Sequence, residues 1–179
     1  MPDPATTELA KRGDRDACGA LLREFQDPWF RMALSLLNNA EHARDAAQET
    51  ALRFLRQLPT FRGDSRLLTW SMGIAINVVR EMRRGGRGDL GGDDESLAAL
   101  PDAGGIDPRD AAIGAERRET VAAVLKELPA RQREAVVLRI FEDLSVEETA
   151  AAMRCAEGTV KATLHQALKA LRLKLKENV

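Results

Sequence analysis

Residues 145–176 carry the sequence pattern that most restricts the fold of this chain. Ser145 and, three positions later, Glu148 fit a capping box, in which each side chain accepts from the other residue's backbone N–H. A short helix is therefore expected from Val146 to about Met153. The segment 154–156 is long enough for a tight turn, and a second helix opens directly after it. This order predicts a helix-turn-helix.

The second helix of this motif has one apolar face and one basic face. Its apolar residues recur every three or four positions, which is the period of an α-helix: Val160, Leu164, Leu168, Leu171 and Leu175. Another stripe carries Lys161, His165, Lys169, Arg172 and Lys176. The apolar face suits a protein core, and the basic face suits an anionic groove such as that of DNA. The alternative is an ordinary amphipathic helix whose basic face is simply solvated.

Composition favours an all-α protein. Ala and Leu are abundant, β-branched runs are few, and only 4% of residues are aromatic, with no Tyr. No run of about 18 apolar residues occurs, so we expect no membrane insertion, and the first four residues do not resemble a signal peptide. Cys18 and Cys155 lie far apart without metal-ligand spacing. We therefore expect reduced thiols, no metal, no cofactor and a cytoplasmic location.

The net charge of −1 conceals strong segregation along the chain. Residues 53–84 carry +5 and residues 150–179 carry +4, whereas residues 85–120 between them carry −5. A protein that touches one polyanion at two separate places would show this pattern. Charge blocks of this size also arise by chance on solvated helices. The acidic stretch could fold back on either basic segment and weaken DNA binding by the free protein.

Helical periodicity predicts two small helical domains joined by a linker. In the first domain, residues 1–84, we expect helices over 5–26, 29–37, 41–58 and 67–84. Residues 85–109 hold 7 of the 13 glycines and 2 of the 7 prolines, which is typical of a flexible, here acidic, tether (residues 85–110). The second domain, residues 111–179, is expected to be a four-helix unit. Its helices would run over 112–128 and 129–141, followed by the two of the helix-turn-helix.

Three segments, in this order, resemble the extracytoplasmic-function (ECF) sigma factors of bacterial RNA polymerase. The first is Asp45–Thr50, and the second combines Phe61–Ser65, Thr69-Trp70 and Ile74–Asn77. The third combines Leu128–Glu134, Leu138-Arg139, Leu144–Glu148 and Gly158–Lys161. The resemblance covers roughly residues 20–84 and 115–175 and implies two helical domains that bind core RNA polymerase and promoter DNA. It also implies a protein without catalytic activity that an anti-sigma factor commonly holds.

The resemblance implies a role for each segment of the first domain. Asp45, Gln48 and Glu49 would face solvent and bind core polymerase; the alternative is a solvated helix face. Phe61 would form the wall of a pocket for a flipped base of the −10 element, although packing under its loop is an equal alternative. Asn77 would contact a base edge, or be an ordinary surface residue. The phosphate contacts implied are Arg62, Arg66, Arg80, Arg83 and Arg84.

In the second domain, the resemblance implies that the second helix of the motif enters the major groove at the −35 element. The implied DNA-binding residues are Arg139, Thr159, Lys161, Ala162, His165, Gln166 and Lys169. Gln166 would read adenine through a bidentate pair, and Arg139 would contact phosphate. Ala156 stands where the family often has a capping Ser, a change that costs on the order of 1 kcal/mol.

A stand-alone regulator and an enzyme are the two alternative classes of function. A stand-alone helix-turn-helix regulator would bind a palindromic duplex without polymerase, but the basic segment from Phe61 to Asn77 has no role in a dimerisation domain. An enzyme would need a phosphate loop, a paired-histidine metal motif or a nucleophile elbow, and the sequence has none of these. We therefore expect a sigma factor that directs promoter-specific initiation.

Overall fold

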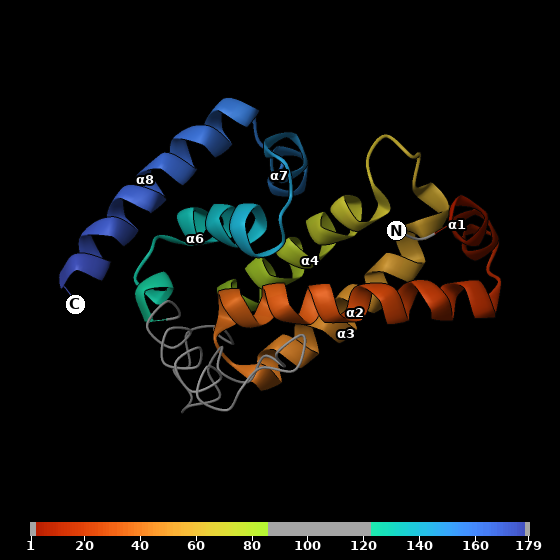
Figure 1. The fold of residues 1–179 in the computed structure, drawn as a ribbon. Helices are drawn as coiled ribbons and strands as arrows, with labels where there is room; N and C mark the ends of the chain where they lie inside the picture. Colours follow the sequence, from red (N-terminus) through yellow and green to blue (C-terminus); the bar gives the residue numbers. More distant parts are fainter. Residues whose placement is uncertain (1–2, 86–122, 178–179) are drawn as a thin grey trace, which may run out of the picture.

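A computed structural model describes residues 3–85 and 123–177. Its longer elements are the helices α1 (Pro4–Lys11), α2 (Arg15–Leu37), α3 (Ala40–Gln57), α4 (Leu67–Arg84), α6 (Ala130–Val136), α7 (Val146–Met153) and α8 (Glu157–Glu177). Two short helical turns, η1 (Leu58–Thr60) and η3 (Val137–Phe141), complete them. No strand occurs in these two ranges. The all-α prediction is confirmed (Figure 1).

The first helix boundary differs from the expected one. The pattern over 5–26 predicted one helix, but the chain breaks at Gly13, whose φ of +87° is a conformation that glycine adopts without strain. Asp14 then caps α2 by accepting from Ala17 N–H at 2.8 Å. From there α2 continues through Pro28, where a boundary was predicted. Burial of Phe25 and Trp29 on either side of Pro28 stabilises the unbroken helix against the loss of one backbone hydrogen bond.

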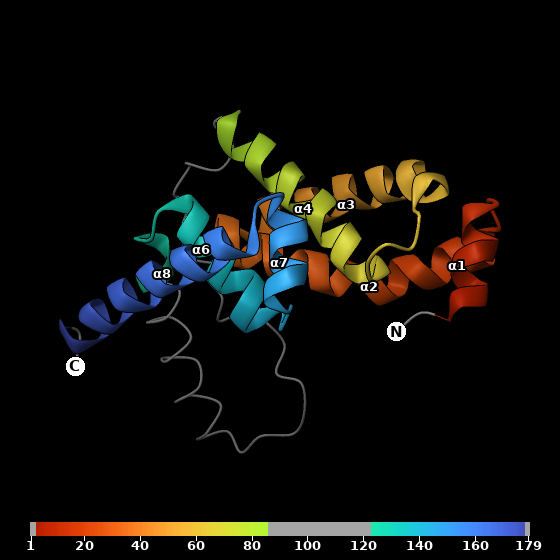
Figure 2. The ribbon, with the colours of Figure 1, turned by 90° about the horizontal axis from the view of Figure 1, so that it is seen from above.

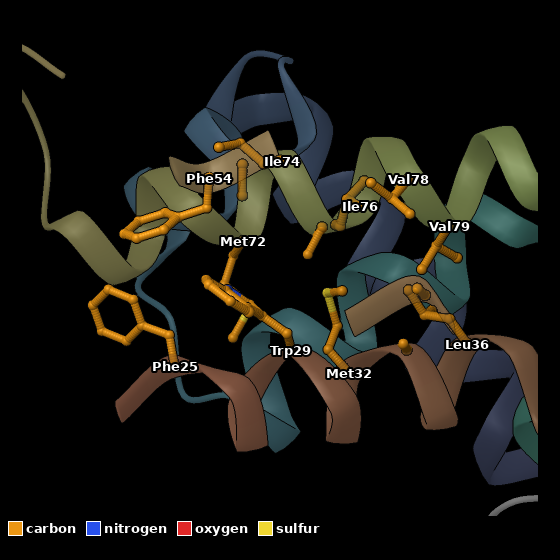
Figure 3. Packing of buried hydrophobic residues seen from close by; sticks show 14 of the residues in the cluster. Phe25, Trp29, Met32, Leu36, Phe54, Met72, Ile74, Ile76, Val78 and Val79 are labelled. Carbon is orange, nitrogen blue, oxygen red and sulfur yellow. The ribbon is translucent and has the colours of Figure 1, made fainter. Parts of the chain in front are cut away.

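The first domain is built on the packing of α2 against α3 and α4. Asn38 ends α2 in the left-handed conformation, and Asn39 caps α3 by accepting from His42 N–H at 2.9 Å. The buried side chains of α2 recur every three or four residues: Leu21, Phe25, Trp29, Met32 and Leu36. Figure 3 shows four of them, Phe25, Trp29, Met32 and Leu36, on the side of α2 that faces Phe54 of α3 and Met72, Ile76 and Val79 of α4. This face forms the main apolar core.

The second domain contains the predicted helix-turn-helix. The capping box of Ser145 and Glu148 is present, α7 spans the predicted residues, and Arg154 turns the chain in the left-handed conformation. Before it, the helix that follows Pro129 ends in a π-helical turn at Phe141. On α8 the inward face includes Val160 and Ala167, both fully buried. The expectation that Leu168 belongs to this face is only partly met, because Leu168 is half-buried.

The two domains pack together. One continuous apolar cluster joins α2, α3 and α4 to Ala135, Leu138, Ala152 and Met153 of the second domain. The closest approach is between α4 and α7, where a Cβ placed on Gly73 would lie 3.6 Å from the backbone of Ala152. Figure 2 shows α7 lying over α4 and α8 extending away from the body, opposite α1. Close helix packing therefore fixes the second domain on one face of α4.

Some predictions fall on residues outside the described ranges. These include almost all of the acidic linker, the idea that it folds back on a basic segment, and most of the helix expected over 112–128. From residue 123 the chain resumes as a helical turn, and Leu125 and Leu128 pack with Val136 and Ala167 in a second, smaller cluster. No helix in the described part of the chain is both long and apolar enough to cross a membrane.

Candidate nucleic-acid interface

The outer face of α8 presents every residue predicted for −35 recognition on that helix. The exposed side chains are Thr159, Lys161, Ala162, His165, Gln166 and Lys169. Lys161 forms an exposed i,i+4 ion pair with Glu157 at 3.6 Å, which leaves its ammonium mobile at the surface. His165 and Lys169 line a shallow pocket of about 340 Å³ with Arg172. A face with five cationic or polar side chains and a small Ala among them fits a groove.

Arg139 lies away from this face. It is half-buried, and its Nη1 donates to the carbonyl of Leu144 at 2.7 Å, while its Nε is buried without a hydrogen-bond partner. The guanidinium thus holds the loop that leads to the cap of α7. The predicted phosphate contact of Arg139 stays a prediction.

The basic end of α4 forms one wall of a pocket between the domains. Asn77, Arg80, Arg83 and Arg84 line a pocket of about 600 Å³, and the opposite wall consists of Ala130, Arg131 and Glu134 of α6. The structure therefore brings together four of the residues predicted for the −10 element. It also places them beside the second domain, where Asn77, Arg80 and Arg83 are half-buried and Arg84 is exposed.

Glu134 is the acidic centre of this pocket. It is 2% exposed and accepts from Nε and Nη2 of Arg80 at 3.0 and 2.6 Å, a bidentate pair. Arg131 approaches the same carboxylate at 3.4 Å. Sequence reasoning missed Glu134, because its partner Arg80 is 54 positions away and nothing local marks the pair.

A second carboxylate binds the start of α4. Glu148 accepts from Arg66 Nη1 at 3.2 Å and from Thr69 Oγ1 at 2.8 Å, while its other oxygen completes the capping box of α7. Burial works to raise the pKa of Glu148, but the bonds from Ser145 and Thr69 and the charge of Arg66 outweigh it. The pKa therefore lies below its ordinary value, and the carboxylate is charged at neutral pH.

Phe61 and Arg62 occupy the loop between η1 and α4. Phe61 is half-buried, with its ring centroid 5.2 Å from that of Trp70, which in turn stacks at an angle on Phe54 at 5.9 Å. The loop turns at Gly63, whose φ is +82°. Arg62 is exposed. The aromatic column fixes the loop on the core and leaves Phe61 partly accessible.

The residues predicted for polymerase binding line a groove between α3 and α4. Asp45 and Gln48 are exposed and Glu49 is half-buried on the outer face of α3, where Glu49 pairs with Arg53 at 2.7 Å. Together they line a groove of about 600 Å³ that includes Leu52 and Glu81. Leu52 is 53% exposed and was not singled out from sequence, although it follows Asp45 and Gln48 at helical spacing. An exposed leucine amid acidic groups suits a protein partner.

Comparison with known proteins identifies the family. The family model described as Sigma-70 region 2 matches residues 21–88, and the one described as Sigma-70, region 4 matches residues 118–171. The RNA polymerase sigma-H factor of Pseudomonas aeruginosa is 34% identical over 178 residues, covering 94% of this chain and 91% of the relative. The ECF RNA polymerase sigma factor SigW of Bacillus subtilis is 28% identical over 174 residues, covering 93% of each.

The chain belongs to the ECF RNA polymerase sigma factors. Its function is accordingly promoter-specific initiation of transcription, in agreement with the interpretation of its sequence. The alternative of a stand-alone regulator has less support, because both sigma regions match in order.

Two solved structures resemble this ECF sigma factor over most of its length. CnrH in complex with the cytosolic domain of CnrY aligns with a TM-score of 0.72 and 20% identity, covering 98% of this chain and 97% of that one, which shows a shared fold. The sigma factor RpoE in complex with the anti-sigma factor NepR from Bartonella quintana aligns with a TM-score of 0.67 and 27% identity. That alignment covers 88% of this chain and 96% of RpoE.

Proposed function

We propose that this ECF sigma factor binds core RNA polymerase through α3 and recognises a two-part promoter through α4 and α8. The observation that supports this best is the outer face of α8, where Lys161, His165, Gln166 and Lys169 are all exposed on one helix that projects from the body. Residues 1–84 then form the polymerase-binding and −10 domain, and residues 111–179 form the −35 domain. Residues 85–110 connect them.

The side chains on the outer face of α8 differ in the kind of DNA contact that they can make. Gln166 offers both an amide donor and an acceptor, the pair that recognises the edge of adenine. Lys161 and Lys169 supply sequence-independent attraction to phosphates, and Ala162 allows close approach to the bases. In the first domain, Asn77 contacts a base edge, and Phe61 with Arg62 holds an unstacked base and its phosphate. Arg80, Arg83 and Arg84 contact the backbone once the pocket between the domains is open.

The partners follow from these surfaces. Core RNA polymerase binds the groove of Asp45, Gln48 and Glu49, and promoter DNA binds α4 and α8. RpoE binds the anti-sigma factor NepR, and we propose that a protein of the same kind holds this factor inactive. The protein acts in the cytoplasm, without catalytic activity of its own.

Run-off transcription with core RNA polymerase and a library of promoter fragments tests this function. We expect transcripts that start at a shared distance downstream of a two-part motif. Gln166→Ala should lower discrimination at one −35 base by about 1–3 kcal/mol, because it removes one bidentate pair. Lys161→Ala should weaken all promoters alike and reduce the salt slope by about one.

Glu177→Gln serves as the control, since it changes a charge at the far end of the same helix. Absence of any transcript, together with binding of the free protein to a palindromic duplex, would favour the stand-alone regulator instead.

A further inference from the structure

Two carboxylates of the second domain accept hydrogen bonds from polar side chains of α4 that face the same direction. Glu134 lies on Arg80, and Glu148 lies on Arg66 and Thr69. Both contacts join residues at least 54 positions apart, and both lie on the face of α4 that packs against α6 and α7. Arg66 and Arg80 are among the arginines for which the resemblance implies phosphate contacts, so the domain contact and the proposed DNA binding involve the same groups.

The geometry of each contact is also that of phosphate recognition. The fork of Arg80 meets both oxygens of Glu134, and the same fork binds two oxygens of a phosphate. Arg66 and Thr69 converge on a single oxygen of Glu148, and arginine with a hydroxyl group is a common pair on the DNA backbone. At 1.5 Å per residue the two sites lie about 20 Å apart along α4. That distance spans about six phosphates of one strand.

We propose that Glu134 and Glu148 stand in for two backbone phosphates, so that the second domain competes with DNA for the same side chains of α4. The inference rests on the proposed function, because it takes α4 as a DNA-binding helix. In the free protein these side chains are paired with the two carboxylates, although Arg66 at the rim is 48% exposed and Arg80 is 24% exposed. DNA can take their donor groups only when the carboxylates leave them.

The energetics of the exchange favour a contact that can be reversed. A buried ion pair gives little net stabilisation over its solvated, separated ions, because desolvation offsets the Coulomb attraction. Replacing a carboxylate on Arg80 by a phosphate keeps the arginine paired throughout. The apolar contacts of Ala152 and Met153 with α4 are what must be broken without replacement. The affinity of the free protein for DNA is reduced by the fraction of molecules in which the domains are apart.

Binding of the full-length protein to a labelled, mixed-sequence DNA duplex at low salt tests the competition. Phosphate contacts do not depend on sequence, so no promoter needs to be known. The variant Glu134→Gln/Glu148→Gln removes both charges but keeps hydrogen bonds, and glutamine still serves in a capping box. We expect this variant to bind the duplex about three- to tenfold more tightly than the unchanged protein.

The matched control is Asp143→Asn/Glu147→Gln, which removes two negative charges from exposed positions of the same domain. We expect a gain of less than about twofold there, because general attraction is all that changes. Adding Arg66→Ala and Arg80→Ala to the double glutamine variant should abolish its gain. An equal gain in the control, or a gain that survives loss of both arginines, overturns the proposal.

Circular dichroism checks that the variants fold. If Glu134→Gln unfolds the chain, Glu148→Gln alone takes its place, since Glu148 is at the interface rim with 18% of its side chain exposed. The single variant should bind about two- to threefold more tightly, and no change overturns the proposal. Run-off transcription with the unchanged protein separates the two ideas: a lack of transcripts refutes the proposed function, whereas transcripts without any gain in duplex binding refute the competition alone.

Discussion

Trp29 is fully buried, and its indole nitrogen donates to the hydroxyl of Ser71 at 3.0 Å. The hydroxyl of Ser71 in turn donates to the carbonyl of Leu68 at 2.8 Å, so both polar groups are satisfied inside the core. Arg133 works in a similar way at the domain boundary, where it donates to the carbonyl of Leu36 near the end of α2. Burial lowers the pKa of Arg133, and the nearby charge of Arg83 lowers it further. Single polar side chains thus join elements far apart in sequence.

Glu142 makes stability depend on pH. Burial raises its pKa to about 7, although the charge of Arg31 at 3.8 Å opposes the shift. The unfolded chain releases this proton near pH 4.5, so between these values the native state binds more protons. The contribution of the protonated Glu142 to the free energy of unfolding is fully present below pH 4.5 and is lost as the pH rises through 7. Relative to Glu142→Gln, the unchanged protein should lose about 3 kcal/mol of unfolding free energy between pH 4.5 and 8.

Urea unfolding at several pH values measures this difference. Asp143→Asn is the matched control, because Asp143 is exposed and asparagine tolerates its φ of +48°. Parallel pH profiles for the unchanged protein and Glu142→Gln would contradict the expected proton uptake.

Among the helices, local sequence signals predicted some bounds correctly and others wrongly. The bounds of α4 and α7 agree with those predicted, because a run of apolar residues at helical spacing begins and ends with clear signals. The break at Gly13 and the continuity through Pro28 were predicted wrongly. The break reflects local features, the left-handed conformation of Gly13 and the cap by Asp14, which the apolar pattern over 5–26 did not reveal. The continuity through Pro28 depends on packing, because the burial of Phe25 and Trp29 outweighs the local cost of proline.

The cap of α7 is the element with the clearest expected cost. Ser145→Ala removes the acceptor for Glu148 N–H, a bond of 3.0 Å, and should lower the unfolding free energy by about 1 kcal/mol. Ser145→Thr keeps the acceptor and should restore most of the loss. Urea unfolding measures both variants. A loss in the Thr variant as large as in the Ala variant would show that the hydroxyl is not what matters.

At the scale of the whole molecule, the contact between the domains decides what is accessible. It leaves the outer face of α8 and the groove on α3 open, and it covers one face of α4. Among the residues predicted for the −10 element, Arg62 and Arg84 are exposed, whereas Arg80 is paired with the second domain. The proposed competition makes separation of the domains a requirement for the DNA contact of Arg80.

A disulfide across the contact tests whether separation is needed. In a chain with Cys18→Ala and Cys155→Ala, the pair Gly73→Cys and Ala152→Cys places two thiols where α4 and α7 approach closely, since a Cβ at position 73 lies 3.6 Å from the Cα of Ala152. Oxidation of the pair is checked first by loss of free thiols. We expect the oxidised protein to lose run-off transcription and the reduced protein to regain it. The control is the chain with Cys18→Ala and Cys155→Ala alone, treated with the same oxidant. Full activity of the cross-linked form would show that the domains need not part.

Local sequence patterns sufficed to predict most of the helices, the cap of α7 and several of the buried faces. It predicted the all-α class, the capping box at Ser145, the helix-turn-helix and the exposed polar face of α8. These follow from the period of the helix and from hydrogen bonds between residues three or four positions apart, so neighbouring residues suffice to specify them. The resemblance to a family then supplied roles for single residues, and these roles stay predictions.

Tertiary structure alone decided how the domains meet. Arg80 finds Glu134 54 positions away, and Thr69 finds Glu148 79 positions away, with no signal at either end of the sequence. Such pairs form because the apolar face of α4 and the small residues Gly73 and Ala152 let two helices approach closely. The charges then lie wherever that packing puts them. For this reason the contacts of Arg80 and Thr69 with the second domain were not predicted from the sequence, whereas Arg62, Arg66 and Arg84 remain exposed.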